Sequence, residues 1–110
     1  MIKKGINDFS IVDETFSKSR QEKYRKQREE RGFDDTELWN LNTTIARFML
    51  PRFIEFRKQT QGYPPTLTEA EWDVVLQNII NSLKNYIEEK ENDCSTAMTL
   101  IAKYFNNLWW

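Results

Sequence analysis

The chain of 110 residues contains no histidine and only one cysteine, Cys94. Without histidine, no serine or cysteine nucleophile can be paired with an imidazole base, and the usual general base near neutral pH is missing. A single cysteine excludes a disulfide within the chain and fits a reducing compartment. The usual tetrahedral zinc site of nitrogen and sulfur ligands cannot be assembled either. We therefore expect no enzyme activity, no metal site and no cofactor.

Glycine and long apolar runs are also scarce. Three glycines, at positions 5, 32 and 62, are too far apart to form a glycine-rich loop that cradles phosphate groups. No stretch approaches 18 consecutive apolar residues, so we expect no membrane-spanning helix and no membrane partner. The first ten residues carry positive charge but no apolar core, which argues against a signal peptide. A cytoplasmic location is the expectation from these features.

Aromatic residues, in contrast, are numerous, with four Trp, four Tyr and seven Phe. Each can bury about 150–250 Å², so together they suffice to form much of a core or to line an interface. Charge is nearly balanced overall but unevenly placed: residues 17–31 hold seven Lys and Arg against three Glu, whereas residues 66–93 hold seven acids against two Lys. This asymmetry suits docking between the two segments, within one chain or between chains.

Apolar periodicity predicts an all-α protein, a compact bundle of about four helices. Asp13 is a candidate N-cap for the first helix, and Asp34 or Asp35 for the second. Thr68 and Glu71 have the spacing of a capping box before the third helix. We expect an N-terminal arm over residues 1–12 and a single helical domain over 13–110, with helices at about 13–31, 36–58, 69–89 and 94–108.

The expected second helix is the most strongly patterned part of the chain. Its apolar residues recur at steps of three and four, and further apolar positions widen the stripe, as in a central helix packed on more than one side. Pro51 removes one backbone donor, and we expect a kink there because the periodicity continues across it. The first helix has almost no apolar face beyond Phe16 and Tyr24, so it must dock through those two rings and its charges.

Aromatic and arginine side chains suggest a binding site. Arginine offers a planar fork for phosphate or carboxylate and stacks on aromatic rings, while Trp and Tyr provide flat apolar surface with one donor each. An anionic, planar ligand such as a nucleotide fits such a set. Alternatively, the tryptophans belong to the core and Arg47 pairs with Glu37, Glu55 or Glu71. The candidate ligand-binding residues are Trp39, Asn40, Arg47, Arg52, Tyr63 and Trp72.

The chain ends on two tryptophans, Trp109 and Trp110, which are an apolar liability if they are left exposed. They are expected to pack either on their own core or on a partner subunit. With Phe16 and Tyr24 of the first helix, they are the candidate residues of an oligomer or partner interface. We expect a homo-oligomer on these grounds.

Residues 31–83 resemble a two-part pattern found in small uncharacterised helical accessory proteins of tailed bacteriophages. The first part is RGFDDTELWNLNTTIARFMLP and the second is GYPPTLTEAEWD. Asn42 is a departure from the pattern, because the bacteriophage proteins often carry Asp there. The matching residues are Arg31, Gly32, Phe33, Asp35, Trp39, Asn40, Leu41, Ala46, Leu50, Pro51, Gly62, Tyr63, Pro64, Thr68, Glu69, Glu71 and Trp72.

The resemblance implies a phage accessory protein that acts in the host cytoplasm. The first hypothesis is a non-catalytic binding protein for counter-defence or host takeover, which sequesters a nucleotide-type signal or a host protein. The alternative is a structural or assembly component of a phage particle or an oligomeric scaffold. Nucleic-acid binding through residues 18–31 is a third, less favoured hypothesis, because such domains are usually basic overall and this chain is not.

Overall fold

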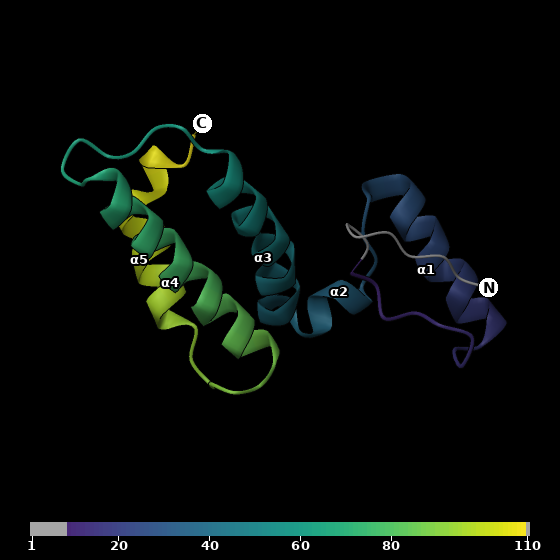
Figure 1. Cartoon of the computed structure of the whole chain (residues 1–110). Coiled ribbons are helices and arrows are strands. Elements are labelled where there is room, and N and C mark those ends of the chain that lie inside the picture. The colour runs from purple at the N-terminus through teal and green to yellow at the C-terminus, as the bar shows by residue number, and fades with distance from the viewer. Residues whose placement is uncertain (1–8, 110) are drawn as a thin grey trace. The chain divides into compact units, whose positions relative to one another are not determined.

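The computed structural model describes residues 9–109, and it confirms the all-α class (Figure 1). The described residues contain no strand, and four helices have seven or more residues. None of the described helices combines the length and the apolar character needed to span a membrane. In chain order, the elements are α1 (Lys18–Arg31), α2 (Thr36–Trp39), α3 (Leu41–Gln59), α4 (Glu69–Ile87), α5 (Ser95–Tyr104) and the short 3-10 helix η1 (Phe105–Asn107).

The chain divides into two compact units, one ending at Phe48 and the other beginning at Met49, within α3. Each unit is considered by itself below. The single domain expected over residues 13–110 stays a prediction, and most of the arm expected over residues 1–12 lies outside the described residues.

In the first unit, α1 begins five residues later than predicted, so the Asp13 cap is wrong. The Asp13 carboxylate accepts hydrogen bonds from the backbone N–H and the hydroxyl of Thr15, which makes a local turn instead of a helix start. Ser17 caps the helix, and its hydroxyl accepts from the Arg20 N–H at 3.3 Å. Gly32 ends the helix at φ 84°, and its N–H donates to the Arg28 carbonyl at 2.9 Å.

Helix α1 docks through its aromatic and charged side chains, as its sequence requires. Tyr24 is 5% exposed and meets Phe16 and Trp39 edge to face, each with ring centroids 6.2 Å apart. Ion pairs then link the end of α1 to the segment that follows it. Arg28 lies 2.5 Å from Asp34.

The predicted helix over 36–58 is interrupted at Asn40, so it forms two helices. Asn40 has φ −129° and ψ 67°, outside the helical region, and α3 begins at the next residue. Thr44 fixes the junction, because its hydroxyl donates to the Glu37 carbonyl at 2.8 Å. Pro51 lies inside α3, which the structure assigns as one continuous helix through Gln59.

In the second unit, α4 and α5 pack against each other and carry most of the buried apolar side chains (Figure 1). The capping box of Thr68 and Glu71 is present in both directions, which confirms that helix start. Helix α4 ends at Ile87, and Glu89 just beyond it has φ 60°. The buried apolar side chains of the pair are Trp72, Leu76, Ile79, Ile80, Leu83, Ala97 and Tyr104.

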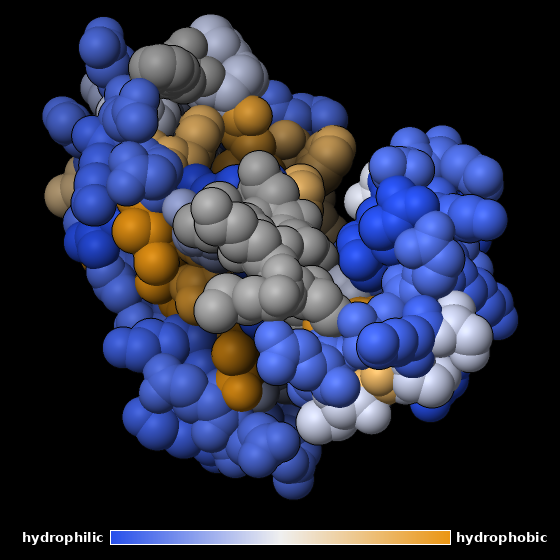
Figure 2. Space-filling view, turned by 90° about the vertical axis from the view of Figure 1, so that its right-hand side faces the viewer, coloured by the Kyte–Doolittle hydropathy of each residue, from blue (hydrophilic) through white to orange (hydrophobic). Residues whose placement is uncertain are grey.

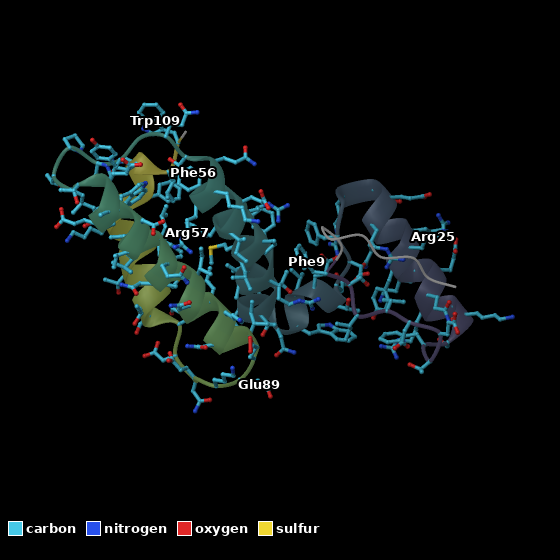
Figure 3. All side chains as sticks on the ribbon, viewed as in Figure 1. Phe9, Arg25, Phe56, Arg57, Glu89 and Trp109 are labelled. Atoms are coloured by element: carbon cyan, nitrogen blue, oxygen red, sulfur yellow. The ribbon has the colours of Figure 1, made fainter. Side chains whose placement is uncertain are left out.

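Large hydrophobic side chains also reach the surface. Figure 2 shows orange side chains among the mainly blue ones of the visible face. Trp109, at the end of the chain beyond η1 (Figure 3), is 72% exposed, so packing on its own core is wrong for this residue. The helical path ends before it, because Leu108 has φ −83° and ψ 63°. Trp110 lies outside the described residues.

Candidate functional site

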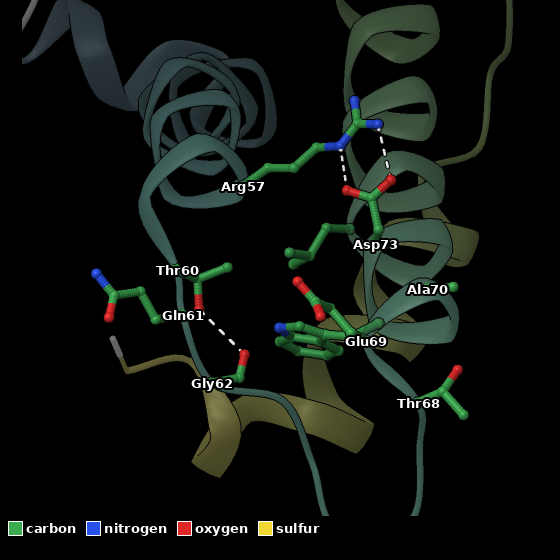
Figure 4. A pocket seen from close by; sticks show the side chains of 10 residues that line it. Arg57, Thr60, Gln61, Gly62, Thr68, Glu69, Ala70 and Asp73 are labelled. Atoms are coloured by element: carbon green, nitrogen blue, oxygen red, sulfur yellow. Dashed lines mark hydrogen bonds and ion pairs between the residues drawn. The ribbon is translucent and has the colours of Figure 1, made fainter.

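A pocket of about 550 Å³ lies in the second unit, between the last turn of α3, the loop that follows and the first turns of α4 (Figure 4). The loop of residues 60–68 returns the chain from α3 to α4. The residues that line the pocket are Arg57, Thr60, Gln61, Gly62, Thr68, Glu69, Ala70, Trp72, Asp73 and Leu76.

The strongest polar contact at the pocket is the pair of Arg57 and Asp73, which joins α3 to α4 (Figure 4). The guanidinium donates to both carboxylate oxygens, at 2.8 and 3.0 Å, and its third nitrogen donates to Gln77. These hydrogen bonds raise the pKa of Arg57 and lower the pKa of Asp73. Both groups are therefore charged near neutral pH and engaged with each other, so the pair adds no net charge to the pocket.

Trp72 lines the inner wall of the pocket and is only 2% exposed. Its ring meets Tyr104 edge to face at 5.5 Å, which leaves no open ring face for stacking. Within the described part of the chain, its indole N–H donates no hydrogen bond, and no buried side-chain nitrogen or oxygen there lacks a partner. The indole nitrogen is therefore not fully buried, and Trp72 is one of the residues that line the pocket.

The remaining polar groups of the pocket differ in how far they are engaged. The Thr68 hydroxyl is used by the capping box with Glu71, which lies outside the lining. The Thr60 hydroxyl donates to the Gly62 carbonyl at 3.3 Å. Gln61 and Glu69 are exposed, and among the described residues neither side chain forms an ion pair or a hydrogen bond. Glu69 is thus the one lining charge without a partner in the part described.

The six candidate ligand-binding residues are divided between the two units. Trp39, at the end of α2, is 51% exposed and lies edge-on against Tyr24. Asn40 forms the break between α2 and α3. The Arg47 guanidinium lies 5.9 Å from the centre of the Phe9 ring, and the ion pairs with glutamate considered for Arg47 are not formed among the described residues.

In the second unit, only Trp72 of the candidates lines the large pocket, and its burial agrees with the alternative that it belongs to the core. Arg52 lines a separate shallow hollow with Phe53, Phe56 and Leu108, of about 170 Å³. Tyr63 is half exposed in the loop after α3.

The candidate interface residues also differ in their surroundings. Tyr24 is buried inside the first unit, and Phe16 is half-buried beside it. The guanidinium of Arg20 lies 4.7 Å from the centre of the Phe16 ring. Of the terminal pair, Trp109 is the described residue and remains exposed.

Sequence reasoning missed Arg57, Asp73, Gln61 and Glu69 as pocket residues. Arg57 and Asp73 are 16 positions apart, and their pairing depends on how tightly the intervening loop folds back. The short loop between the two predicted helices could have indicated this pair, because such a loop brings the last turn of the first helix near the first turn of the second. An arginine and an aspartate in those two turns are then candidates for an ion pair.

Comparisons with known proteins give no match. This applies to family models, to curated proteins and to solved structures. The resemblance to bacteriophage accessory proteins therefore stays a prediction. Among the described residues, no group of three potential metal-ligating side chains comes together.

Proposed function

We propose that the chain is a non-catalytic binding protein that captures a small molecule of the nucleoside or nucleotide type in the pocket between α3 and α4. The observation that carries this proposal is the accessible indole N–H of the otherwise buried Trp72. A donor held in a rigid wall and left without a protein partner is the kind of group that fixes a ligand's orientation. The pocket volume, about 550 Å³, falls within the range of small-molecule sites, about 300–1,000 Å³.

Binding is favoured over catalysis by the way the charged groups of the pocket are used. Arg57 and Asp73 hold each other in a two-point ion pair, and the lowered pKa of Asp73 opposes its use as a proton donor near neutral pH. Among the described lining residues, Glu69 is the carboxylate without an ion-pair or hydrogen-bond partner. The pocket therefore offers recognition contacts without an acid–base pair.

The biological setting follows from the resemblance to phage accessory proteins. A protein of that kind that captures a nucleotide-type signal in the host cytoplasm would act in counter-defence or host takeover. The same binding protein can instead capture a host protein. The exposed aromatic side chains of Trp39 and Tyr63 support this alternative, because they offer apolar surface to a protein partner. An unoccupied pocket in every ligand test would favour the protein partner.

Thermal unfolding of the purified chain against a panel of nucleosides, nucleotides and cyclic dinucleotides tests the proposal. A ligand at 100 times its dissociation constant adds about 2.7 kcal/mol to the free energy of unfolding, which corresponds to roughly ten degrees in Tm for a domain of this size. Ala70→Trp fills the pocket from an exposed position and is expected to abolish the shift. Ala102→Trp, at an exposed position of α5, is the matched control and should retain it.

A flat panel, or a shift that survives Ala70→Trp, would remove the support for ligand capture in this pocket. The second candidate function, a structural or assembly role, would then gain weight. The exposed Trp109 and the exposed apolar residues of α3 favour it specifically, since such side chains commonly mark protein contacts. Mass spectrometry of purified virions tests that role, and absence of the chain from the particle would count against it.

Nucleic-acid binding through residues 18–31 receives less support, because several of the cations there are paired. Arg25 lies 2.6 Å from Glu22 and 2.8 Å from Glu29, and Arg28 is paired with Asp34. Affinity for DNA or RNA that falls steeply with salt would revive this hypothesis.

A further inference from the structure

The electrostatic character of the pocket restricts the ligand further than the proposed function does. Arg57 and Asp73 neutralise each other, and the third guanidinium nitrogen donates to Gln77, so each of the three nitrogens already has a protein acceptor. Glu69 then leaves the lining with one net negative charge. It also lies in the first turn of α4, where its negative charge partly neutralises the positive end of the helix dipole. An anion entering the pocket meets repulsion from Glu69, and the described lining residues provide no unpaired cation to offset it.

The hydrogen-bonding groups of the pocket define a complementary pattern. The indole N–H of Trp72 can donate to one acceptor of the ligand, such as a carbonyl or a ring nitrogen. The Glu69 carboxylate can accept from an amino or ring N–H group, and the Gln61 amide can do either. A ligand that presents an acceptor and a donor along one planar edge, as a nucleobase does, matches the indole N–H and the Glu69 carboxylate, whereas the Gln61 side chain points away from Glu69 (Figure 4).

We infer that the pocket binds a nucleobase or nucleoside and discriminates against the phosphorylated forms of the same compound. This inference rests on the proposed function and narrows the ligand class of the same pocket from nucleosides and nucleotides to nucleobases and nucleosides. Discrimination arises because a phosphate gains no contact with Arg57 and is repelled by Glu69. At low salt, a nucleoside is expected to bind about fivefold more tightly than its 5′-monophosphate, the effect of about one screened charge–charge repulsion.

The first experiment is a titration of the ¹⁵N-labelled chain with four nucleosides and their 5′-monophosphates, observed at the tryptophan indole N–H signals. Trp72→Phe, which removes the donor and keeps an aromatic ring, assigns the Trp72 signal. Binding of a nucleoside should move that signal, and the dissociation constant follows from the titration. Because Trp72 is buried and Trp72→Phe can lower stability, the decisive variant is one at the exposed Glu69.

Glu69→Gln removes the repelling charge and leaves an amide that still accepts a hydrogen bond. It should bring the affinity of the monophosphate to within about twofold of that of the nucleoside. Glu30→Gln makes the same change of charge at an exposed position of α1, in the first unit, and should leave the wild-type ratio unchanged.

The outcomes separate the two proposals. Monophosphates that bind as tightly as nucleosides, move the Trp72 signal and are excluded by Ala70→Trp would overturn the selectivity while leaving ligand capture intact. An unchanged ratio in Glu69→Gln would overturn the role of Glu69. A Trp72 signal that no compound moves would overturn ligand capture in this pocket and the selectivity with it.

Discussion

At the scale of the residue, the first unit depends on one buried carboxylate. Asp34 has no exposed surface. It accepts hydrogen bonds from the Ser10 hydroxyl, from the Thr36 N–H at 2.9 Å and from the Arg28 guanidinium at 2.5 Å. These contacts join the segment before α1, α1 itself and the start of α2. A buried charge is tolerated only when its hydrogen bonds are satisfied, as they are here.

Replacing Asp34 with alanine should strongly destabilise the protein. The change leaves the Arg28 guanidinium and two hydroxyls without their shared acceptor, and breaking a buried ion pair costs about 3–5 kcal/mol. Because Arg28 is partly exposed, we expect the lower end, about 3 kcal/mol. Urea unfolding measures the loss. Asp35→Ala, which removes the exposed pair with Arg31, is the control and should change the midpoint little; equal losses would refute the special role of Asp34.

The same carboxylate makes the free energy of unfolding depend on pH. Burial alone would raise the pKa of Asp34, but the hydrogen bonds from Ser10, Thr36 and Arg28 outweigh it and hold that pKa below the ordinary value. When folding lowers the pKa of a carboxyl group, the ionised group contributes to the free energy of unfolding. This contribution is fully present above the pKa of the unfolded state, about 3.9, and it is lost as the pH falls through the pKa of the folded state.

The free energy of unfolding, measured by urea at a series of pH values from 7 downward, should therefore decline below about pH 4. Asp34→Asn cannot ionise, so its curve should decline less over that interval, although its stability at pH 7 is lower. Parallel curves for the wild type and Asp34→Asn would show that other carboxylates carry the acid dependence.

At the scale of the element, the ends of the helices are set by single side chains. The capping box of Thr68 and Glu71 starts α4, and the first turn of α4 carries Glu69 and Ala70 to the pocket. Gly32 ends α1 in the left-handed region, at φ 84°, where a side chain is strained. Each of these residues acts on one helix end without contributing to a core.

Thr68→Ala should cost about 1 kcal/mol of unfolding free energy, because one backbone N–H of α4 loses its acceptor. Thr68 is exposed, so no packing is lost with the hydroxyl. Thermal or urea unfolding provides the measurement. Thr66→Ala, two residues earlier and also exposed, should be nearly neutral, and a similar loss in both variants would exclude a specific capping effect.

At the scale of the whole molecule, several large apolar side chains of α3 are exposed. Leu41 and Ile45 lie one turn apart on α3 and are each more than two-fifths exposed, whereas Ala46 on another side of the helix is buried. The sequence predicts that this helix is packed on more than one side. In the described chain, only one side of it is buried. This difference is consistent with the expected homo-oligomer.

Sedimentation velocity over a range of concentrations tests this prediction. The wild-type chain should associate, and the double change Leu41→Gln with Ile45→Gln should shift it to the monomer, because both residues are exposed and their apolar surface drives association. Val74→Gln, at an exposed apolar position on α4, is the control and should not change the association. A wild-type chain that remains monomeric at all concentrations would contradict the prediction.

The sequence alone determined the helical class and the helix ends that depend on short-range contacts. The apolar periodicity of α4 and the box of Thr68 and Glu71 act within a few residues, so they can be read from the order of the chain. Asp13 and Asn40 show the limit of such reading. Either residue can cap a helix, form a turn or continue a helix. Asp13 forms a turn with Thr15, and Asn40 leaves the helical region between α2 and α3.

Only the tertiary structure decided the pocket and the buried charge. Arg57 meets Asp73 across a loop, and Asp34 receives hydrogen bonds from residues up to 24 positions away. It also decided that the ring of Trp72 is buried against Tyr104 while its indole nitrogen is not fully buried. Periodicity can identify a residue that faces inward, but the atom that stays accessible depends on how neighbouring helices pack around it.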